Sequence, residues 1–407
     1  MILVGEKNGI LLDIKTQKEG HIIYDYPNKE IKEINTFIED STFIIYNNNK
    51  FLRIDKQFNI NPRNGDQQLF HIRKTKNNDF TIENPVLSTL SLENTDSLNY
   101  KLWFIINLED KNNEIINDDY YLNLDDIVKF GNVKYIILEI HINSNEKKNE
   151  ENSPEPKNVI DDTYDISSLN KSFPKISILI PEIKIYYESL DENTHIKCHI
   201  CNNNTCSNDD PIIQFCQCNF VHFKCLKKSI KMIIKKNKSQ NVTNYYIHMA
   251  SCKSCQYIYP FSFKLGQKTF ELLDIEKPIK EDYIVLESIE KKIYFGYIKI
   301  IHVIKFAQNN MSVNIGRKNT CDVIVRDPSV SKEHAILKFD KENHRILIKN
   351  KSAKYGTLVL IKKAIKINNN KIQFQVGKNI IETQKMKFDD FEKIKDKKKT
   401  KYPLPKE

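Results

Sequence analysis

Long apolar runs are missing from this 407-residue chain. None approaches the ~18 residues that a helix needs to cross a bilayer, and residues 1–7 lack the basic and apolar pattern of a secretory leader. We therefore expect a soluble intracellular protein, cytoplasmic or associated with an assembly, with no signal peptide and no membrane span.

Cysteine is scarce outside one stretch: eight of the nine fall between Cys198 and Cys255, and only Cys321 lies elsewhere. Because reducing compartments keep thiols free, this clustering indicates metal binding and argues against disulfides. We interpret Cys321 as a small buried apolar residue.

Glycine is also scarce, with ten residues, whereas Lys, Asn and Ile dominate. The net charge of +10 reflects this biased composition and is weak evidence for nucleic-acid binding. The length favours two to four domains, each with its own core, over a single one.

Residues 1–142 alternate short β-type runs with Asn, Asp and Gly turns. Residues 120–140 carry the clearest local signal and predict three strands separated by an acidic turn and a glycine turn. We expect a β-sandwich-like scaffold, with a second ligand-binding sandwich as the alternative. Polar residues 143–172 are too poor in apolar side chains to fold and predict a linker.

The clustered cysteines and one histidine follow the spacing of paired metal ligands. Four pairs occur in order: Cys198 and Cys201, Cys216 and Cys218, His222 and Cys225, and Cys252 and Cys255. Eight such donors suit two tetrahedral zinc ions. His195 and His199 are alternatives with poorer spacing, and Cys206 is surplus to the eight.

This pattern resembles the RING-CH (RING-variant) zinc finger. The resemblance implies a two-zinc cross-brace in which ligand pairs one and three hold one ion and pairs two and four hold the other. It also implies docking of a ubiquitin-conjugating enzyme, with no covalent intermediate and no catalytic residue on the finger. Ile200 matches the family's apolar docking residue, whereas Ser229 replaces its usual Trp and Lys253 replaces a common Pro.

The insert after Cys225 predicts the finger's one helix. Leu226, Ile230, Ile233 and Ile234 recur at helical spacing with lysines opposite them. The lysines on the opposite side of this helix are either solvated or able to bind phosphates. We expect the finger with its leading strands to span residues 173–262, and a connector to span 263–292.

Residues 293–383 contain three motifs, around Gly316, from Ser329 to Ala335, and around Gly356. In this order and spacing they resemble the forkhead-associated (FHA) domain, a β-sandwich whose loops bind phosphothreonine peptides. The resemblance implies that the phosphopeptide is bound by Arg317 and Ser331, which hold the phosphate, with Lys332 and Lys354 nearby. It implies that the loops are shaped by Gly316, His334, Gly356 and Thr357.

A guanidinium fork suits phosphate bidentately, and a serine hydroxyl adds a neutral donor. For Arg317 the alternative is a structural ion pair with Asp322 or Asp327. Ala353 and Tyr355 replace the Ser and Asn usual in the family. Lysine-rich residues 384–407 predict a flexible basic tail.

The sequence therefore predicts a mainly β, multidomain protein, whose domain order is similar to that of a RING-CH/FHA family of unicellular eukaryotes. We expect a zinc-binding adaptor and ubiquitin ligase that recognises phosphothreonine-bearing partners and positions a ubiquitin-conjugating enzyme. The alternative is a non-enzymatic interaction subunit of a larger assembly. Nucleic-acid binding by the lysine helix and tail is the weakest hypothesis, because no aromatic platform is interleaved with the lysines.

Overall fold

The computed structural model describes residues 8–17, 31–46, 52–55, 67–84, 98, 101–106, 120–143, 181–190, 195–289, 297–307, 311–351, 353, 356–377 and 379–401. The protein is mostly β, with two helices among these residues. Neither helix has the length and apolar character needed to cross a bilayer. Apart from Asn143, the predicted linker lies outside the described residues.

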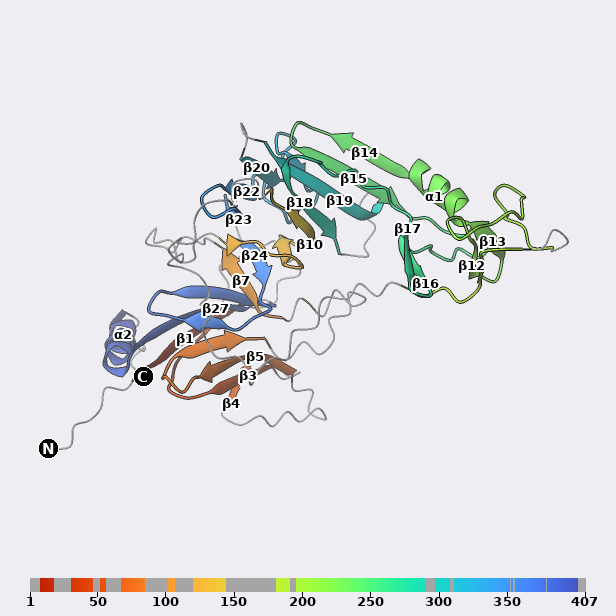
Figure 1. The fold of residues 1–407 in the computed structure, drawn as a ribbon. Coiled ribbons are helices and arrows are strands. Elements are labelled where there is room, and N and C mark those ends of the chain that lie inside the picture. Colours follow the sequence, from red (N-terminus) through yellow and green to blue (C-terminus); the bar gives the residue numbers. More distant parts are fainter. Residues whose placement is uncertain are drawn as a thin grey trace.

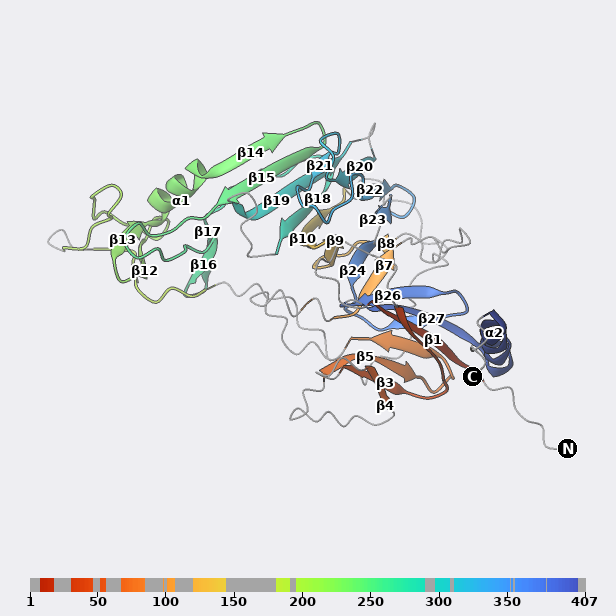
Figure 2. The ribbon, with the colours of Figure 1, turned by 180° about the vertical axis from the view of Figure 1, so that it is seen from behind.

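The longest sheet joins segments from distant parts of the sequence (Figures 1 and 2). Its strands, from edge to edge, are β14 (Ile234–Lys238), β15 (Val242–His248), β19 (Tyr297–Phe306), β18 (Asp282–Ser288), β10 (Val133–His141), β9 (Ile127–Phe130), β24 (Thr357–Leu360), β7 (Trp103–Ile106), β26 (Ile372–Val376), β27 (Asn379–Lys387), β1 (Asn8–Gln17) and β2 (Ile31–Ile38). Because sequence-distant strands alternate along it, the sheet cannot be assembled from local hairpins alone.

One half of this sheet forms a first sandwich with a five-stranded sheet. The strands of that second sheet are β21 (Val323–Ile324), β20 (Ser312–Gly316), β22 (Ala335–Asp340), β23 (Arg345–Asn350) and β8 (Tyr120–Tyr121). The core between the sheets includes Phe130, Tyr135, Ile304, Ile315 and Ile348. The domain boundaries at 142 and 293 stay predictions, but strands from both sides of them share this sheet and this core.

The three strands predicted within residues 120–140 are confirmed as β8, β9 and β10. Asp125 in the acidic turn has a φ of 65° and Gly131 in the glycine turn a φ of 58°. Both turns therefore use the left-handed conformation that reverses a chain tightly.

The other half of the long sheet forms a second sandwich. It packs on β25 (Ile365–Ile367), β6 (Phe80–Glu83), β5 (Gln67–Lys74), β3 (Thr42–Tyr46) and β4 (Leu52–Asp55). Its core, which includes Phe70, Phe80 and Phe374, combines residues from both ends of the chain.

The C-terminal residues differ from the expected flexible tail. Residues 384–387 complete β27, and α2 (Phe388–Lys401) follows directly. The rings of Phe388 and Phe391 each lie 5.3 Å from that of Phe37. Two aromatic residues one turn apart thus give a lysine-rich segment an apolar face that holds it on β2.

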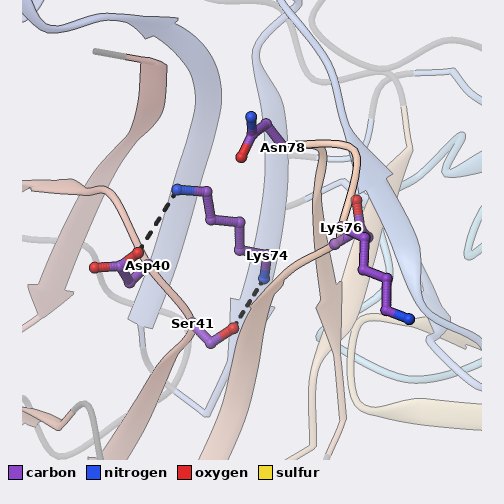
Figure 3. Close-up of a pocket in the computed structure, with 6 residues that line it drawn as sticks. Asp40, Ser41, Lys74, Lys76 and Asn78 are labelled. Atoms are coloured by element: carbon purple, nitrogen blue, oxygen red, sulfur yellow. Dashed lines mark hydrogen bonds and ion pairs between the residues drawn. The ribbon is translucent and has the colours of Figure 1, made fainter.

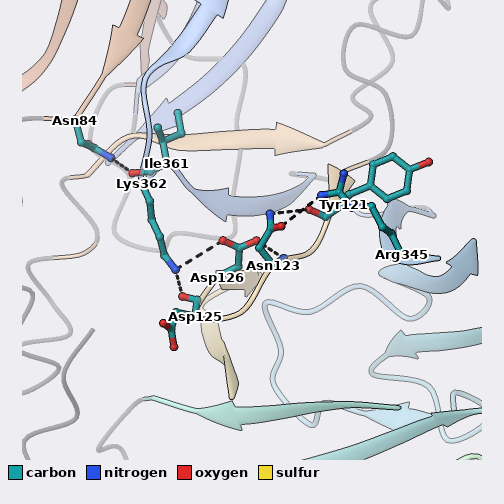
Figure 4. A network of polar contacts seen from close by, with 8 residues as sticks. All are labelled: Asn84, Tyr121, Asn123, Asp125, Asp126, Arg345, Ile361 and Lys362. Atoms are coloured by element: carbon teal, nitrogen blue, oxygen red, sulfur yellow. Dashed lines mark hydrogen bonds and ion pairs between the residues drawn. The ribbon is translucent and has the colours of Figure 1, made fainter. Parts of the chain in front are cut away.

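Polar contacts join the two sandwiches near β7 and β24 (Figure 4). The buried side-chain amide of Asn84 donates to the carbonyls of Leu102 at 3.2 Å and Ile361 at 2.7 Å. Next to Ile361, Lys362 pairs with the buried Asp126 at 3.7 Å. Buried polar atoms at this junction are therefore paired, which fixes the strand ends relative to one another.

The cysteine-rich region lies beyond the β14 side of the long sheet (Figure 1). It contains a small sheet of β11 (Tyr186–Tyr187), β12 (Ile212–Cys216) and β13 (Asn219–His222), the hairpin of β16 (Ser262–Leu265) and β17 (Lys268–Glu271), and the helix α1 (Phe223–Met232). Leu226 and Ile230 of α1 are buried against Ile213, Val221 and Phe263.

The predicted helix is shorter than its apolar spacing suggested. It ends at Met232, and Ile234 begins β14, paired with Ile247 of β15. The adjacent β-branched residues Ile233 and Ile234 favour a strand once a partner is present. The insert between Cys225 and Cys252 therefore supplies a hairpin to the long sheet.

Candidate metal centre and phosphate-binding loops

The paired cysteines and His222 lie in two groups of four. Within each group the possible donor atoms all lie within 4.8 Å of one another. One group is Cys198, Cys201, His222 and Cys225, and the other is Cys216, Cys218, Cys252 and Cys255. This grouping follows the interleaved order that the resemblance implied, and each group could hold a metal ion.

Local structure orients His222 in the first group. Its Nδ1 lies 3.3 Å from Cys201 Sγ and 3.8 Å from Cys225 Sγ. Its Nε2 lies 2.7 Å from the carbonyl oxygen of Thr205. Since a carbonyl only accepts, we assign the proton to Nε2, which leaves the Nδ1 lone pair for a metal. The role of Thr205 had no signal in the sequence, because any residue type offers a carbonyl.

The two Cys-x-x-Cys turns share one backbone shape. The N–H of Asn202 donates to the Cys198 carbonyl at 2.7 Å, and the N–H of Gln256 donates to the Cys252 carbonyl at 2.9 Å. Asn202 and Gln256 have φ values of 58° and 62°. A left-handed residue after each second cysteine therefore folds the turn back.

Backbone N–H groups favour the thiolate at the first cysteine of each turn. The N–H groups of Cys255 and Ser254 lower the pKa of Cys252 to about 6. Burial would raise the pKa of Cys198, but backbone N–H groups, that of His222 first among them, lower it to about 7. A hydrogen bond with Cys255 raises the pKa of Cys218 to about 12, and burial beside other thiols raises that of Cys225 to about 12. Thiolate is the metal-binding form of cysteine, and sulfur and imidazole donors together suit a soft divalent cation.

The candidate phosphate-binding loops meet at Gly316, the last residue of β20. A Cβ there would lie 2.3 Å from the carbonyl oxygen of Lys332, so this approach requires glycine. The N–H of Arg317 donates to the Ser331 carbonyl, and that of Lys318 to the Lys332 carbonyl, each at 3.0 Å. The backbone thus holds Arg317 and Ser331 together.

Arg317 is exposed, and its Nε donates to the carbonyl of Val330 at 3.1 Å. In the described part of the chain its guanidinium forms no ion pair. Asp322 instead accepts from the N–H of Asn314 at 2.9 Å, and Asp327 accepts from its own loop. The structural ion pair considered for Arg317 is therefore not observed, and its terminal nitrogens face no described acceptor.

His334 lies beneath these loops and is 2% exposed. Its Nδ1 accepts from the N–H of Ser331 at 3.2 Å, and its ring meets that of Phe130 edge-on at 5.5 Å. Burial lowers the pKa of His334 to about 4, so the ring is neutral at pH 7. The neutral ring thus contacts the loop backbone from inside the core, whereas Lys332 is exposed.

The turn between β9 and β10 supports the same loop. The N–H of Asn132 donates to Ser329 Oγ at 2.8 Å, and that hydroxyl donates in turn to Asp327. A Cβ on Gly131 would lie 2.4 Å from Ser329 Oγ. No sequence signal links these residues, because they are far apart along the chain and meet only in the folded protein.

The third motif is described in part. Gly356 has a φ of 75°, and the buried Thr357 donates its hydroxyl to Asn350 Oδ1 at 3.2 Å. Ala353 is buried, whereas Lys354 and Tyr355 lie outside the described residues.

An open pocket of about 550 Å³ lies in the second sandwich, lined by Asp40, Ser41, Lys74, Thr75, Lys76 and Asn78 (Figure 3). The Lys74 ammonium lies 2.8 Å from the carbonyl of Glu39 and 3.6 Å from the Asp40 carboxylate. Its charge is thus already engaged, and the pocket offers no set of converging donors comparable to the loops around Arg317.

Two loops at one end of the first sandwich are thus joined by backbone hydrogen bonds beside Gly316. The FHA domain family model matches residues 313–381, so the chain contains an FHA domain. An FHA domain supports phosphothreonine-dependent interaction with phosphorylated partners. No curated protein and no solved structure matches the chain.

Proposed function

We propose that this protein is a zinc-binding adaptor that recognises phosphothreonine-bearing partners through its FHA domain. Arg317 binds the phosphate through charge-assisted hydrogen bonds and Ser331 adds a hydroxyl. Lys332 adds positive charge beside it, and the resemblance assigns the same role to Lys354, which lies outside the described residues. The observation that carries the proposal is the exposed guanidinium of Arg317, held against the Ser331 loop within the matched segment.

A peptide library tests this function. Full-length protein is incubated with matched libraries that carry phosphothreonine, phosphoserine or unmodified threonine at one fixed position. Enrichment of the phosphothreonine library is expected. Equal recovery of the unmodified library would refute phosphate recognition.

We infer that the two groups of four hold zinc in a RING-CH-like cross-brace. Three cysteines with one histidine, and four cysteines, are donor sets that zinc takes at structural sites. The outward hydrogen bond of His222 Nε2 supports a ligating Nδ1. Elemental analysis of protein purified without added metal should give two zinc ions per chain. A single ion, or iron in place of zinc, would contradict this assignment.

Ubiquitin ligation is a second candidate function, favoured by the position of Ile200. This apolar side chain stands in the first Cys-x-x-Cys turn and is 42% exposed, as a docking residue requires. Ser229 on α1 is half-buried and Lys253 is exposed, so the surface around it is less apolar than in the resembling family. The alternative is a non-enzymatic interaction subunit.

A ubiquitination assay with a panel of conjugating enzymes separates these two functions. Chains that form with the native protein and disappear with Ile200→Ala would support the ligase. Zinc-loaded protein that binds phosphopeptides but forms no chains would instead favour the non-enzymatic subunit.

A further inference from the structure

Lysines are concentrated along α1 and β14, which follow one another along the top of Figure 1. Residues 223–238 contain no acidic side chain and seven lysines, which we call the lysine face: Lys224, Lys227, Lys228, Lys231, Lys235, Lys236 and Lys238. Two of them are paired, Lys227 with Asp274 at 3.1 Å and Lys236 with Glu276 at 2.5 Å. The other five are exposed and form no ion pair with any described residue.

The acidic groups nearby do not neutralise this surface. The ammonium of Lys236 holds the pKa of Glu276 below its usual value, and Lys238 and Lys231 act on it in the same direction. Three lysines therefore surround a single carboxylate, and the lysine face keeps an excess of positive charge.

β14 is the outermost strand of the long sheet in both views (Figures 1 and 2), and its other edge pairs with no described strand. The N–H of Ser239 donates to the Val242 carbonyl at 2.8 Å, and that of His248 donates to the Ile233 carbonyl at 3.4 Å. In an antiparallel pair, every second residue of a strand hydrogen-bonds to its partner strand. These two bonds show that Lys235 and Asn237 are the residues of β14 whose backbone groups face β15.

The backbone N–H and C=O groups of Ile234, Lys236 and Lys238 consequently point to the open edge. Successive side chains of a strand lie on opposite faces, so Lys235 flanks this edge on one face and Lys236 and Lys238 flank it on the other. A strand added at the edge would meet lysines on both of its faces.

We propose that the open edge of β14 binds an extended acidic segment of a partner protein as an added strand. Main-chain hydrogen bonds to β14 supply the binding, and the lysine face selects carboxylate side chains. Lysines at an exposed edge also discourage pairing with neutral strands, which sharpens the preference for an acidic one.

The aromatic residues near the lysine face favour a peptide over single-stranded nucleic acid. The Lys227 ammonium lies over the Phe223 ring at 5.7 Å, and that of Lys236 over the Tyr245 ring at 5.8 Å. Tyr245 is itself buried. Tyr245 is therefore closed to base stacking, on which single-strand binders depend, and Phe223 is half-buried with the Lys227 ammonium over its ring.

Fluorescence anisotropy with the full-length wild-type protein tests the proposal. The probe is a labelled ten-residue peptide of alternating glutamate and threonine. Three competitors are compared with it: the same peptide with glutamine for glutamate, the same peptide with alternate backbone N-methyl groups, and an oligouridine RNA of ten nucleotides. We expect the glutamine and N-methyl peptides to compete roughly tenfold less well than the unlabelled probe, and the RNA no better than either.

A charge-reversed variant adds an independent arm. Lys235→Glu with Lys238→Glu should weaken binding of the acidic peptide roughly tenfold, because it reverses one charge on each face of the edge. Lys338→Glu with Lys341→Glu, an equal change at exposed positions on and just after β22, should leave binding unchanged. Equal competition by the N-methyl peptide would overturn strand addition, and stronger competition by the RNA would assign the lysine face to nucleic acid.

Discussion

The Arg317 side chain donates from Nε to the Val330 carbonyl of the neighbouring loop, and its terminal nitrogens form no ion pair with any described residue. Arg317→Ala should lower affinity for a phosphothreonine peptide about tenfold to a hundredfold, because hydrogen bonds to charged groups contribute about 1.5–3 kcal/mol. Isothermal titration calorimetry measures the loss. Lys338→Ala, an exposed cation on the same sheet, should bind as the wild type does. An unchanged affinity of the Arg317 variant would remove this residue from the phosphate site.

Two buried histidines make stability depend on pH. His302 donates from Nδ1 to Asn244 Oδ1 at 2.6 Å, and its Nε2 lies 3.3 Å from the Tyr135 hydroxyl. Burial lowers the pKa of His302 to about 3 and that of His334 to about 4. An unfolded histidine titrates near 6.5, so above that pH neither state binds the proton. Below that pH the unfolded chain binds protons that the folded protein does not bind. Each histidine therefore lowers the free energy of unfolding by about 1.4 kcal/mol for every unit by which the pH falls.

The variant His302→Gln isolates one of these contributions. Wild type and variant are unfolded in urea at pH 7 and pH 5, with the single tryptophan, buried Trp103, as the fluorescent probe. The stability advantage of the wild type should shrink by about 2 kcal/mol between the two pH values. Metal loss at low pH affects both proteins alike and cancels in the difference. A pH-independent difference would mean that His302 takes up a proton as readily in the folded protein as in the unfolded chain.

At the scale of elements, the β9–β10 hairpin contacts the candidate phosphate-binding loops through Asn132 and Ser329. Gly131→Ala places a Cβ 2.4 Å from Ser329 Oγ at a φ of 58°. Strain and collision together should lower the free energy of unfolding by about 2–4 kcal/mol and weaken phosphopeptide binding. Gly266→Ala is the matched control: its φ is 55°, but its Cβ would meet its nearest neighbour only at 3.9 Å.

Gly266→Ala should therefore show the backbone strain alone, about 1 kcal/mol, with phosphopeptide affinity unchanged. Chemical denaturation and anisotropy measure the two effects. If both variants lost the same stability and neither lost affinity, the turn at Gly131 would not support the loop.

Local sequence patterns predicted the elements correctly where the pattern is compatible with only one kind of secondary structure. Alternating apolar residues between two turn sequences predicted the three strands within residues 120–140, and the RING-CH resemblance implied the two groups of four. The apolar residues after Cys225 fit a helix as far as Ile234, yet Ile234 pairs with Ile247. Helical spacing cannot reveal where a sheet partner takes over from the helix.

Contacts between distant segments were beyond any local pattern. α2 was missed because charged residues flank Phe388 and Phe391, whose partner Phe37 comes from the other end of the chain. The approach of Gly131 to Ser329 likewise depends on the packing of two sheets. The fold class and the donor residues could thus be predicted from the sequence, but not the way in which the segments share sheets.

At the scale of the whole molecule, strands that follow from one region of the chain pair within the sheet of another region. The insert between Cys225 and Cys252 leaves the cysteine-rich region as the β14–β15 hairpin, and β15 pairs with β19 from Val242 to His248. Candidate metal ligands thus lie on both sides of a hairpin whose inner strand belongs to the long sheet. If the proposed zinc ions anchor both ends of the insert, their removal should loosen this side of the sheet as well as the finger.

Hydrogen exchange followed by mass spectrometry, with and without a zinc chelator, tests this long-range effect. Chelation should speed exchange in residues 198–255, because structural zinc contributes much of the folding energy of a small metal domain. Faster exchange should extend into β19, which loses its neighbour β15. The second sandwich, whose core shares no residue with the cysteine-rich region, should keep its protection and serves as the internal control. Loosening confined to residues 198–225 would show that the hairpin is held by the sheet and not by the metal, and equal loosening of the second sandwich would indicate global unfolding.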